Sequence, residues 1–210
     1  KVTKNFAYGK LLEIIEASGN RRPVSCENFK KCGGCSLLHM SYPATLEFKR
    51  KVVRDSFKRI GHRDVEVEET LGMEEPYAYR NKVQFPVGEK DGRVVTGFFA
   101  GRTHDIVPIT DCSIQSRIAN KLINNVREFF RDNNISAYNE KTGNGFVRHV
   151  IIRSSEKSGE IMLILVTNGE EFKLKDKFVE FITDKCSKVK SIMQNINTKN
   201  TNVILGEKNI

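Results

Sequence analysis

Four cysteines are the residues of this chain whose type and spacing could do chemistry. Three lie in the segment Cys26-x5-Cys32-Gly-Gly-Cys35, and the fourth, Cys112, follows far downstream. Chains of reducing compartments keep their thiols free, so metal or redox chemistry is a better interpretation than disulfides. Cys186 stands apart at the end of a predicted helix, where a lone thiol is usually inert. The other four thiolates could wrap a metal centre and join two distant segments.

The spacing alone leaves the identity of the metal open, because thiolates bind both tetrahedral zinc and iron-sulfur clusters. Zinc ribbons usually repeat a pair of Cys-x2-Cys knuckles, whereas here three ligands share one loop and the fourth arrives alone. This layout favours a four-iron four-sulfur cluster. Gly33 and Gly34 would allow positive φ angles and a close approach of N–H groups to sulfide. A bare redox pair is less favoured, since no thioredoxin-like β-α-β pattern surrounds Cys32 and Cys35.

The charge of the chain points to a polyanionic partner. Its 210 residues contain 35 Lys and Arg against 26 Asp and Glu, which gives a net charge of +9. Nucleic acid is the first candidate and an acidic membrane the second. We find no membrane span and no signal peptide, and we therefore expect a cytoplasmic protein that does not contact membranes. Glycine-rich cofactor loops, a P-loop, a nucleophile elbow and a His-Glu-x-x-His motif are all missing from the sequence.

The N-terminal part predicts one strand-like segment and one helix. Residues 6–17 are apolar and strand-like, and residues 41–60 predict a helix with Ser41 as N-cap and Pro43 in its first turn. The apolar stripe of this helix, which we expect to face inward, is Leu46, Val53, Phe57 and Ile60, and its opposite face is basic.

From residue 65 onward the pattern changes to strands and predicts an α+β fold with antiparallel strands. A hairpin is expected around a turn at Asp91–Gly92, and the strand that follows it would deliver Cys112. The full set of predicted strands is 65–71, 80–87, 93–100, 105–109, 145–154, 160–166 and 189–195, with helices at 115–131 and 173–185.

Five segments make the chain similar to a known family. They read, in order, CENFKKCGGCSLLHMSY, EPYAYRNKVQFPVG, GFFAGRTHDIVPITDCSIQ, GFVRHVIIRSS and QNINTKNTNVILG. In order and spacing they resemble the iron-sulfur-containing RNA (uracil-5-)-methyltransferases that modify 23S ribosomal RNA. The resemblance covers essentially the whole chain. It implies that Cys26, Cys32, Cys35 and Cys112 bind a 4Fe-4S cluster.

The resemblance also implies a division into parts. Residues 1–25 would be the tail of a TRAM-type β-barrel, 26–40 the cluster-binding loop, and 62–210 a central RNA-binding α+β domain. The helix at 41–61 would pack on a methyltransferase domain outside this chain. We expect the chain to be one part of a longer protein whose catalytic cysteine, catalytic glutamate and S-adenosylmethionine site follow Ile210, so that no catalytic or cofactor-binding residue is assigned here.

For the whole enzyme the resemblance implies covalent catalysis. A cysteine adds to C6 of a flipped uracil, C5 takes the methyl group from S-adenosylmethionine, and a carboxylate removes the C5 proton. This chain would hold 23S ribosomal RNA, and no obligate protein partner is evident. The candidate RNA-binding residues are Arg80, Lys82, Arg102, His104, Arg148, His149 and Arg153, with Phe85, Phe98 and Phe99 as mostly buried aromatics that could also stack on bases.

Other interpretations remain open at this stage. The chain could be a zinc-binding RNA-binding module without catalytic activity. A radical S-adenosylmethionine enzyme is disfavoured, because those enzymes present Cys-x3-Cys-x2-Cys. We expect the cluster to have a structural or RNA-positioning role, and a redox role is the alternative.

Overall fold

The chain forms two compact units in the computed structural model, which describes residues 2–210. The first unit joins the segment that ends at Ser25 to Leu37–Gly72, and the second joins Cys26–Ser36 to Met73–Ile210. The cysteine loop therefore shares a unit with the sheet described below, whereas the N-terminal helix belongs to the other unit.

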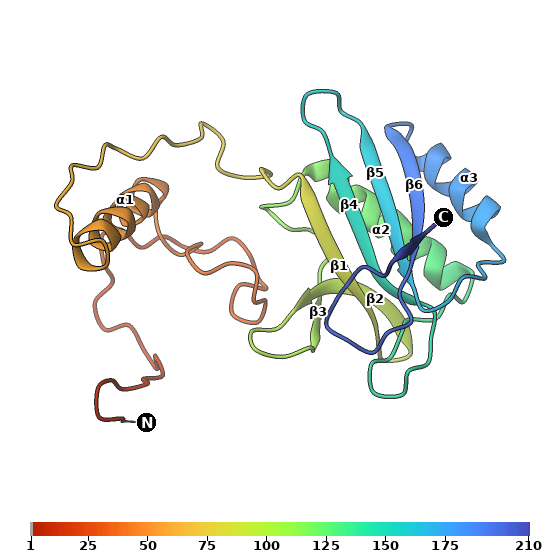
Figure 1. Cartoon of the computed structure of the whole chain (residues 1–210), viewed down its shortest axis with the longest axis horizontal. Coiled ribbons are helices and arrows are strands. Elements are labelled where there is room, and N and C mark those ends of the chain that lie inside the picture. The colour runs from red at the N-terminus through yellow and green to blue at the C-terminus, as the bar shows by residue number, and fades with distance from the viewer. Residues whose placement is uncertain (1) are drawn as a thin grey trace. The chain divides into compact units, whose positions relative to one another are not determined.

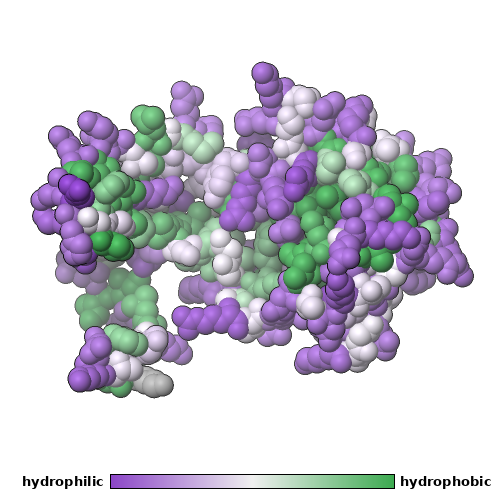
Figure 2. All heavy atoms as spheres, in the orientation of Figure 1, coloured by the Kyte–Doolittle hydropathy of each residue, from purple (hydrophilic) through white to green (hydrophobic). Residues whose placement is uncertain are grey.

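The first unit contains the predicted helix, α1 (Tyr42–Arg59). It starts after Ser41 with a proline in its first turn, although the Ser41 side chain makes no capping hydrogen bond. The apolar stripe is not buried as expected: no residue of α1, all of which is described, is buried, and Phe57 and Ile60 are 46% and 78% exposed. Apolar side chains accordingly lie in view among hydrophilic ones on this unit (Figure 2).

Two strand predictions in the first unit are wrong. Residues 6–17 and 65–71 form no strand, and Leu12 and Ile15 are 86% and 95% exposed. A period-2 pattern needs a neighbouring strand to become a sheet. Residues 65–71 instead contact α1, where the Arg50 Nε donates to the Val67 carbonyl at 2.8 Å and the Thr70 hydroxyl donates to the Leu46 carbonyl at 3.0 Å.

The second unit is built on a seven-stranded sheet with the order β3-β2-β1-β4-β5-β6-β7 (Figure 1). All neighbours are antiparallel except β5 and β6, which are parallel. The α3 helix connects these two strands, as a parallel pair requires. The elements are β1 (Lys82–Lys90), β2 (Arg93–Phe99), β3 (Ile106–Pro108), α2 (Arg117–Asp132), β4 (Val147–Ser154), β5 (Ile161–Thr167), α3 (Lys175–Lys185), β6 (Val189–Ile196) and β7 (Lys208–Asn209).

The hairpin of β1 and β2 turns at Asp91 and Gly92, as predicted. Both residues have positive φ angles, 53° and 71°. Positive φ at both central positions is the geometry of a type I′ turn, which matches the twist of the two strands. The turn pairs Lys90 with Arg93 and so sets the register along the hairpin.

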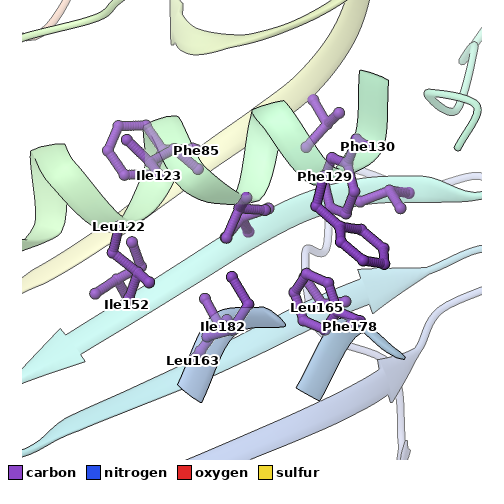
Figure 3. Packing of buried hydrophobic residues seen from close by; sticks show 14 of the residues in the cluster. Phe85, Leu122, Ile123, Phe129, Phe130, Ile152, Leu163, Leu165, Phe178 and Ile182 are labelled. Atoms are coloured by element: carbon purple, nitrogen blue, oxygen red, sulfur yellow. The ribbon is translucent and has the colours of Figure 1, made fainter. Parts of the chain in front are cut away.

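Helices α2 and α3 cover one face of the sheet and enclose the core (Figures 1 and 3). Phe85 of β1 and Phe129, Phe130 and Leu122 of α2 are each at most 1% exposed. A fully buried side chain of this kind contributes about 1.5–3 kcal/mol. The Ser116 hydroxyl caps α2 by accepting from the Ala119 N–H at 3.3 Å. None of the helices formed by residues 2–210 is long and apolar enough to cross a membrane.

The other face of the sheet, which we call the open face, carries no helix. A small apolar cluster of β4 and β5, made of Ile151, Ile164 and Val166, lies on this face and is buried, with Met162, Met193 and Ile204 packed against it. Because side chains alternate along a strand, the residues of β1 that face away from Phe85 lie on this face. The open face is therefore the side of the sheet on which polar side chains can meet a partner.

Candidate nucleic-acid interface and cysteine group

The loop that holds three cysteines lies against the end of β2. The Gly33 N–H donates to the Phe99 carbonyl at 3.0 Å, and Cys32 forms a β-bridge with Ala100. A Cβ on Gly33 would stand 3.2 Å from the Phe99 oxygen, so a side chain would crowd this contact. Gly33 and Gly34 do not have the positive φ that we expected. Gly34 instead provides a close N–H, which donates to the Cys32 Sγ at 3.4 Å.

Cys112 lies beyond β3, in a segment that pairs with residues 78–80. The Ala78 and Arg80 N–H groups donate to the carbonyls of Ser113 and Ile114 at 2.8 and 3.0 Å. The strand before Cys112 was predicted one residue too long at each end: β3 runs from Ile106 to Pro108. The fourth thiol is therefore held by backbone pairing rather than by the strand itself.

The four thiols are electrostatic neighbours. Burial raises the pKa of Cys35 most, and the Cys112, Cys32 and Cys26 thiols raise it further, while the Arg80 guanidinium lowers it. Burial also raises the pKa of Cys112, the Ile114 and Gln115 backbone N–H groups lower it, and Cys26 and Cys32 raise it. Four thiolates would thus repel one another here unless a cation compensated them.

Within residues 2–210, no group of three or more His, Cys, Asp and Glu side chains is arranged to hold a metal ion. Beside the cysteines lies Gln115, which is 1% exposed and whose side-chain amide has no hydrogen-bond partner within the described residues. Cys186 packs against the hydrophobic core instead.

Two of the predicted RNA-binding cations form a pair on the open face. Lys82 and Arg153 are directly opposite each other on β1 and β4, and both are exposed. Arg80 is also exposed, but it precedes β1 and forms an isolated β-bridge with Gln115. Lys82 and Arg153 present two charges that a phosphate backbone could contact.

Arg148 is buried, with 6% exposure, and its donors are used inside the protein. Its Nη1 donates to the Asn197 and Lys199 carbonyls at 2.9 and 2.8 Å, and its guanidinium lies 4.2 Å from the centre of the Tyr138 ring. A register shift between Val147 and His149 marks a β-bulge at this position. A β-bulge changes the direction in which a side chain points. Here the Arg148 side chain holds the segment that follows β6 through these two hydrogen bonds.

His149 faces the open side of the sheet, opposite Pro86, and is 9% exposed. Its Nδ1 has no hydrogen-bond partner among residues 2–210. Burial, and secondarily the Arg148 charge, lower the pKa of His149 to about 4, although Glu140 acts in the opposite direction. The imidazole is therefore neutral at physiological pH.

Arg102 and His104 lie in the exposed turn between β2 and β3. Arg102 has a positive φ of 65°, and the His104 Nδ1 lies 2.8 Å from the Glu140 carboxylate. The Phe99 ring stacks on His104 with centroids 5.0 Å apart. Of the other aromatics, Phe85 is fully buried and Phe98 stacks on it, so both belong to the core.

Sequence reasoning missed three residues of this region: Tyr138, Glu140 and Gln115. Tyr138 and Glu140 come from a loop between α2 and β4 that no motif marks, and tertiary folding alone brings them to Arg148 and His104. For Gln115 the signal was its place three residues after Cys112.

Comparison with known proteins gives close relatives of this chain. A protein of Clostridium tetani named an uncharacterized RNA methyltransferase is 46% identical over 210 residues, which are 100% of this chain and 46% of that protein. A protein of the same description from Clostridium acetobutylicum is 47% identical over 213 residues, again 100% of this chain and 46% of the relative. No protein-family model matches the chain.

A solved structure agrees with these relatives. It is that of the Pyrococcus abyssi tRNA (uracil-54, C5)-methyltransferase in complex with S-adenosyl-L-homocysteine. The likeness has a TM-score of 0.66 and 27% identity, and it covers 93% of this chain and 42% of that one. The chain spans about half the length of the curated relatives it matches. In sequence and in fold, it is similar to one half of an RNA methyltransferase.

Proposed function

We propose that this chain is the RNA-holding part of an S-adenosylmethionine-dependent RNA (uracil-5-)-methyltransferase that makes 5-methyluridine in 23S ribosomal RNA. One observation carries the proposal: the similarity to proteins named RNA methyltransferases runs along the whole chain. The structural relative is named for a uracil-5 position and was solved with S-adenosyl-L-homocysteine. S-adenosylmethionine would supply the methyl group in the other half of the protein.

The open face supports the RNA-holding role. Lys82 and Arg153 stand opposite each other, and Arg80 and Arg102 are exposed beyond the strand ends. Contacts of this kind neutralise phosphates and give affinity that falls with salt. Arg148 would act indirectly, because its hydrogen bonds to the Asn197 and Lys199 carbonyls hold that segment in place.

Transfer RNA is a second candidate substrate, because the name of the structural relative specifies tRNA. The two RNAs can be separated by competition between a 23S fragment and tRNA for the chain at fixed salt. Tighter binding of tRNA would overturn the ribosomal assignment and leave the uracil-5 chemistry in place.

The four cysteines, in our proposal, hold a 4Fe-4S cluster. A tetrahedral zinc ion needs all four sulfurs about 2.3 Å from one point, whereas a cluster binds each cysteine at a different iron and spreads them apart. The observation that favours the cluster is the spacing of the cysteines, with three in one loop and the fourth far downstream. Its role would be structural: Gly33 and Cys32 fix one side of the loop to β2, and the cluster would join it to Cys112.

The remaining parts follow the same proposal. The exposed apolar residues of α1 would pack on the methyltransferase half, residues 1–25 would be the tail of a TRAM-type barrel, and the protein would be cytoplasmic. The first of these is supported by the absence of buried residues along α1 and by relatives about twice as long.

The test begins with anaerobic preparation and analysis of iron, sulfide and zinc. We expect about four irons per chain, lost in Cys112→Ser and kept in the matched control Cys186→Ser. One tightly bound zinc would instead favour a zinc-binding RNA-binding module without catalytic activity.

RNA binding is measured separately over a series of salt concentrations. Lys82→Ala should reduce the salt slope by about one, and Lys121→Ala, an exposed lysine of α2, should leave it unchanged. Equal effects of the two variants would remove the open face from the interface.

A further inference from the structure

A cavity of about 430 Å³ opens at one end of the open face. It is bounded by residues 86–90 of β1, Phe99, the turn at 104–106, residues 138–141 and the pair Arg148 and His149, all within the second unit. Its volume lies within the usual range of ligand pockets, about 300–1,000 Å³. The structural role found for Arg148 does not account for this space.

The cavity contains an unused hydrogen-bonding group. His149 is more than nine-tenths buried, and its Nδ1 has no partner within residues 2–210. A neutral imidazole carries one N–H donor and one acceptor lone pair. A buried polar atom without a partner is costly, so a ligand that completed this hydrogen bond would recover that cost.

Flat rings line the same space. Phe99 and His104 stack with an interplanar angle of 18°, and Tyr138 lies under the Arg148 guanidinium. Unpaired RNA bases are commonly bound by stacking on aromatic side chains and on guanidinium planes. The walls thus suit a planar ligand.

The charges around the cavity argue against a phosphate. The three carboxylates Glu89, Asp105 and Glu140 match the three cations Lys90, Lys141 and Arg148, and the Arg148 Nη1 is already occupied. Two exposed cations, Lys82 and Arg153, lie opposite each other on the open face instead. Carboxylates accept hydrogen bonds only, and Glu140 would therefore select a ligand that carries N–H donors.

We infer that this cavity binds an unpaired, amino-bearing nucleobase of the RNA, hydrogen-bonded by His149 and Glu140 and stacked on the Phe99–His104 pair. The inference rests on the proposed function and extends it. We expect a base other than the methylated uracil, because the N3–H of uracil is flanked by two carbonyl oxygens that the Glu140 carboxylate would repel, whereas an exocyclic amino group has no such pair of oxygens beside it. It would be a neighbouring base that fixes the register of the RNA while phosphate contacts hold the strand.

The test uses NMR of the isotopically labelled 210-residue chain, with the ring signals of His149 as reporter. Adenosine, cytidine, uridine and inorganic phosphate are added separately. We expect shifts with adenosine or cytidine, weaker shifts with uridine, and none with phosphate. Equal responses to uridine, a response to phosphate, or no response to any nucleoside would each overturn the inference.

Glu140→Gln tests the selection, and its site is exposed, so folding is not at risk. Loss of a charged acceptor should reduce the preference for amino-bearing nucleosides over uridine on the order of tenfold. Glu89→Gln is the matched control: it removes another exposed carboxylate of the same cavity, one to which the inference gives no contact with the base, and it should retain the preference. An unchanged preference in Glu140→Gln would contradict the assigned role of the carboxylate.

Failure here and failure of the proposed function give different results. If the chain binds RNA with salt-dependent affinity while the His149 ring signals do not shift on addition of nucleosides, the cavity assignment is wrong and the proposed function stands. If the chain binds neither 23S fragments nor tRNA, the proposed function fails and the base assignment fails with it.

Discussion

His149 should make the stability of the chain depend on pH in a way that can be worked out from the structure. The side chain is 9% exposed, and burial, followed by the Arg148 charge, lowers its pKa from 6.5 to about 4. In the unfolded chain the imidazole regains its ordinary pKa. At pH values between about 4 and 6.5, the unfolded state therefore binds a proton that the folded state does not bind.

The sign and size follow from proton linkage. The contribution of His149 to the free energy of unfolding is fully present above pH 6.5, the unfolded pKa. It is lost progressively as the pH falls through the folded pKa of about 4, and it stays constant once both states are protonated. The two pKa values, 6.5 and about 4, differ by about 2.5, and each pH unit corresponds to about 1.4 kcal/mol. The complete change is therefore about 3.5 kcal/mol, of which about 3 kcal/mol of unfolding free energy is lost through this residue by pH 4, where the folded imidazole is half protonated.

The assay is urea denaturation at a series of pH values between 4 and 7.5, under reducing conditions. Circular dichroism is the probe, since the chain has no tryptophan. Carboxylates also titrate in this range, so the quantity of interest is the difference between the native sequence and His149→Phe. That difference should change by about 3 kcal/mol in favour of the variant as the pH falls.

His104→Phe provides the matched control, because it makes the same substitution at an exposed histidine of the same cavity. It should keep the pH dependence of the native sequence. If His149→Phe and the native sequence lose stability in parallel between pH 6.5 and 4.5, the protonated imidazole finds a partner or water in the folded state. The burial argument would then be refuted.

Three further predictions concern the packing of the second unit and are read by urea denaturation at pH 7. Gly97→Ala should destabilise the second unit by about 1–3 kcal/mol, because the new Cβ would stand 1.9 Å from the Val107 carbonyl oxygen. Its control, Gly101→Ala, has open space around the new Cβ and should change the free energy of unfolding little. Equal effects of the two substitutions would show that β3 can shift to make room. Arg148→Met should cost about 2–4 kcal/mol because two carbonyls lose their charged donor, and a cost below 1 kcal/mol would show that water replaces it. Gln115→Met should be neutral or stabilising by about 1 kcal/mol because the buried amide has no partner within the described residues, and a clear loss of stability would reveal one.

The elements with strong local signals were predictable from the sequence. The Asp91–Gly92 turn and the 3.6-residue period of α2 predicted the hairpin and the helix within three residues of their observed bounds. The parallel pairing of β5 and β6 was missed, although its signal was present: a helix of about a dozen residues between two strands is typical of a parallel pair. The prediction of an antiparallel sheet is thus wrong for this one pair.

Features that depend on distant partners were not predictable. The segments 6–17 and 65–71 have strand-like patterns but no neighbouring strand, so their residues stay irregular. Arg148 looks like a surface cation in the sequence, and only the bulge beside it and the carbonyls of residues 197 and 199 explain its burial. Glu140 is 36 residues from His104 along the chain, and no local motif connects them.

One residue connects the cysteine loop with the proposed base-binding cavity. The Phe99 carbonyl accepts the Gly33 N–H, while the Phe99 ring stacks on His104 in the cavity wall. The Phe99 backbone is therefore bonded both to Ile106 of β3 and to a loop whose three thiols, with Cys112, would repel one another as thiolates. A centre that neutralises the thiols would order the loop and, through Phe99, the stacking surface. Under the proposed function, a structural cluster would in this way affect RNA recognition without any electron transfer, which would give the cysteines a physical reason to lie beside the proposed RNA-binding face.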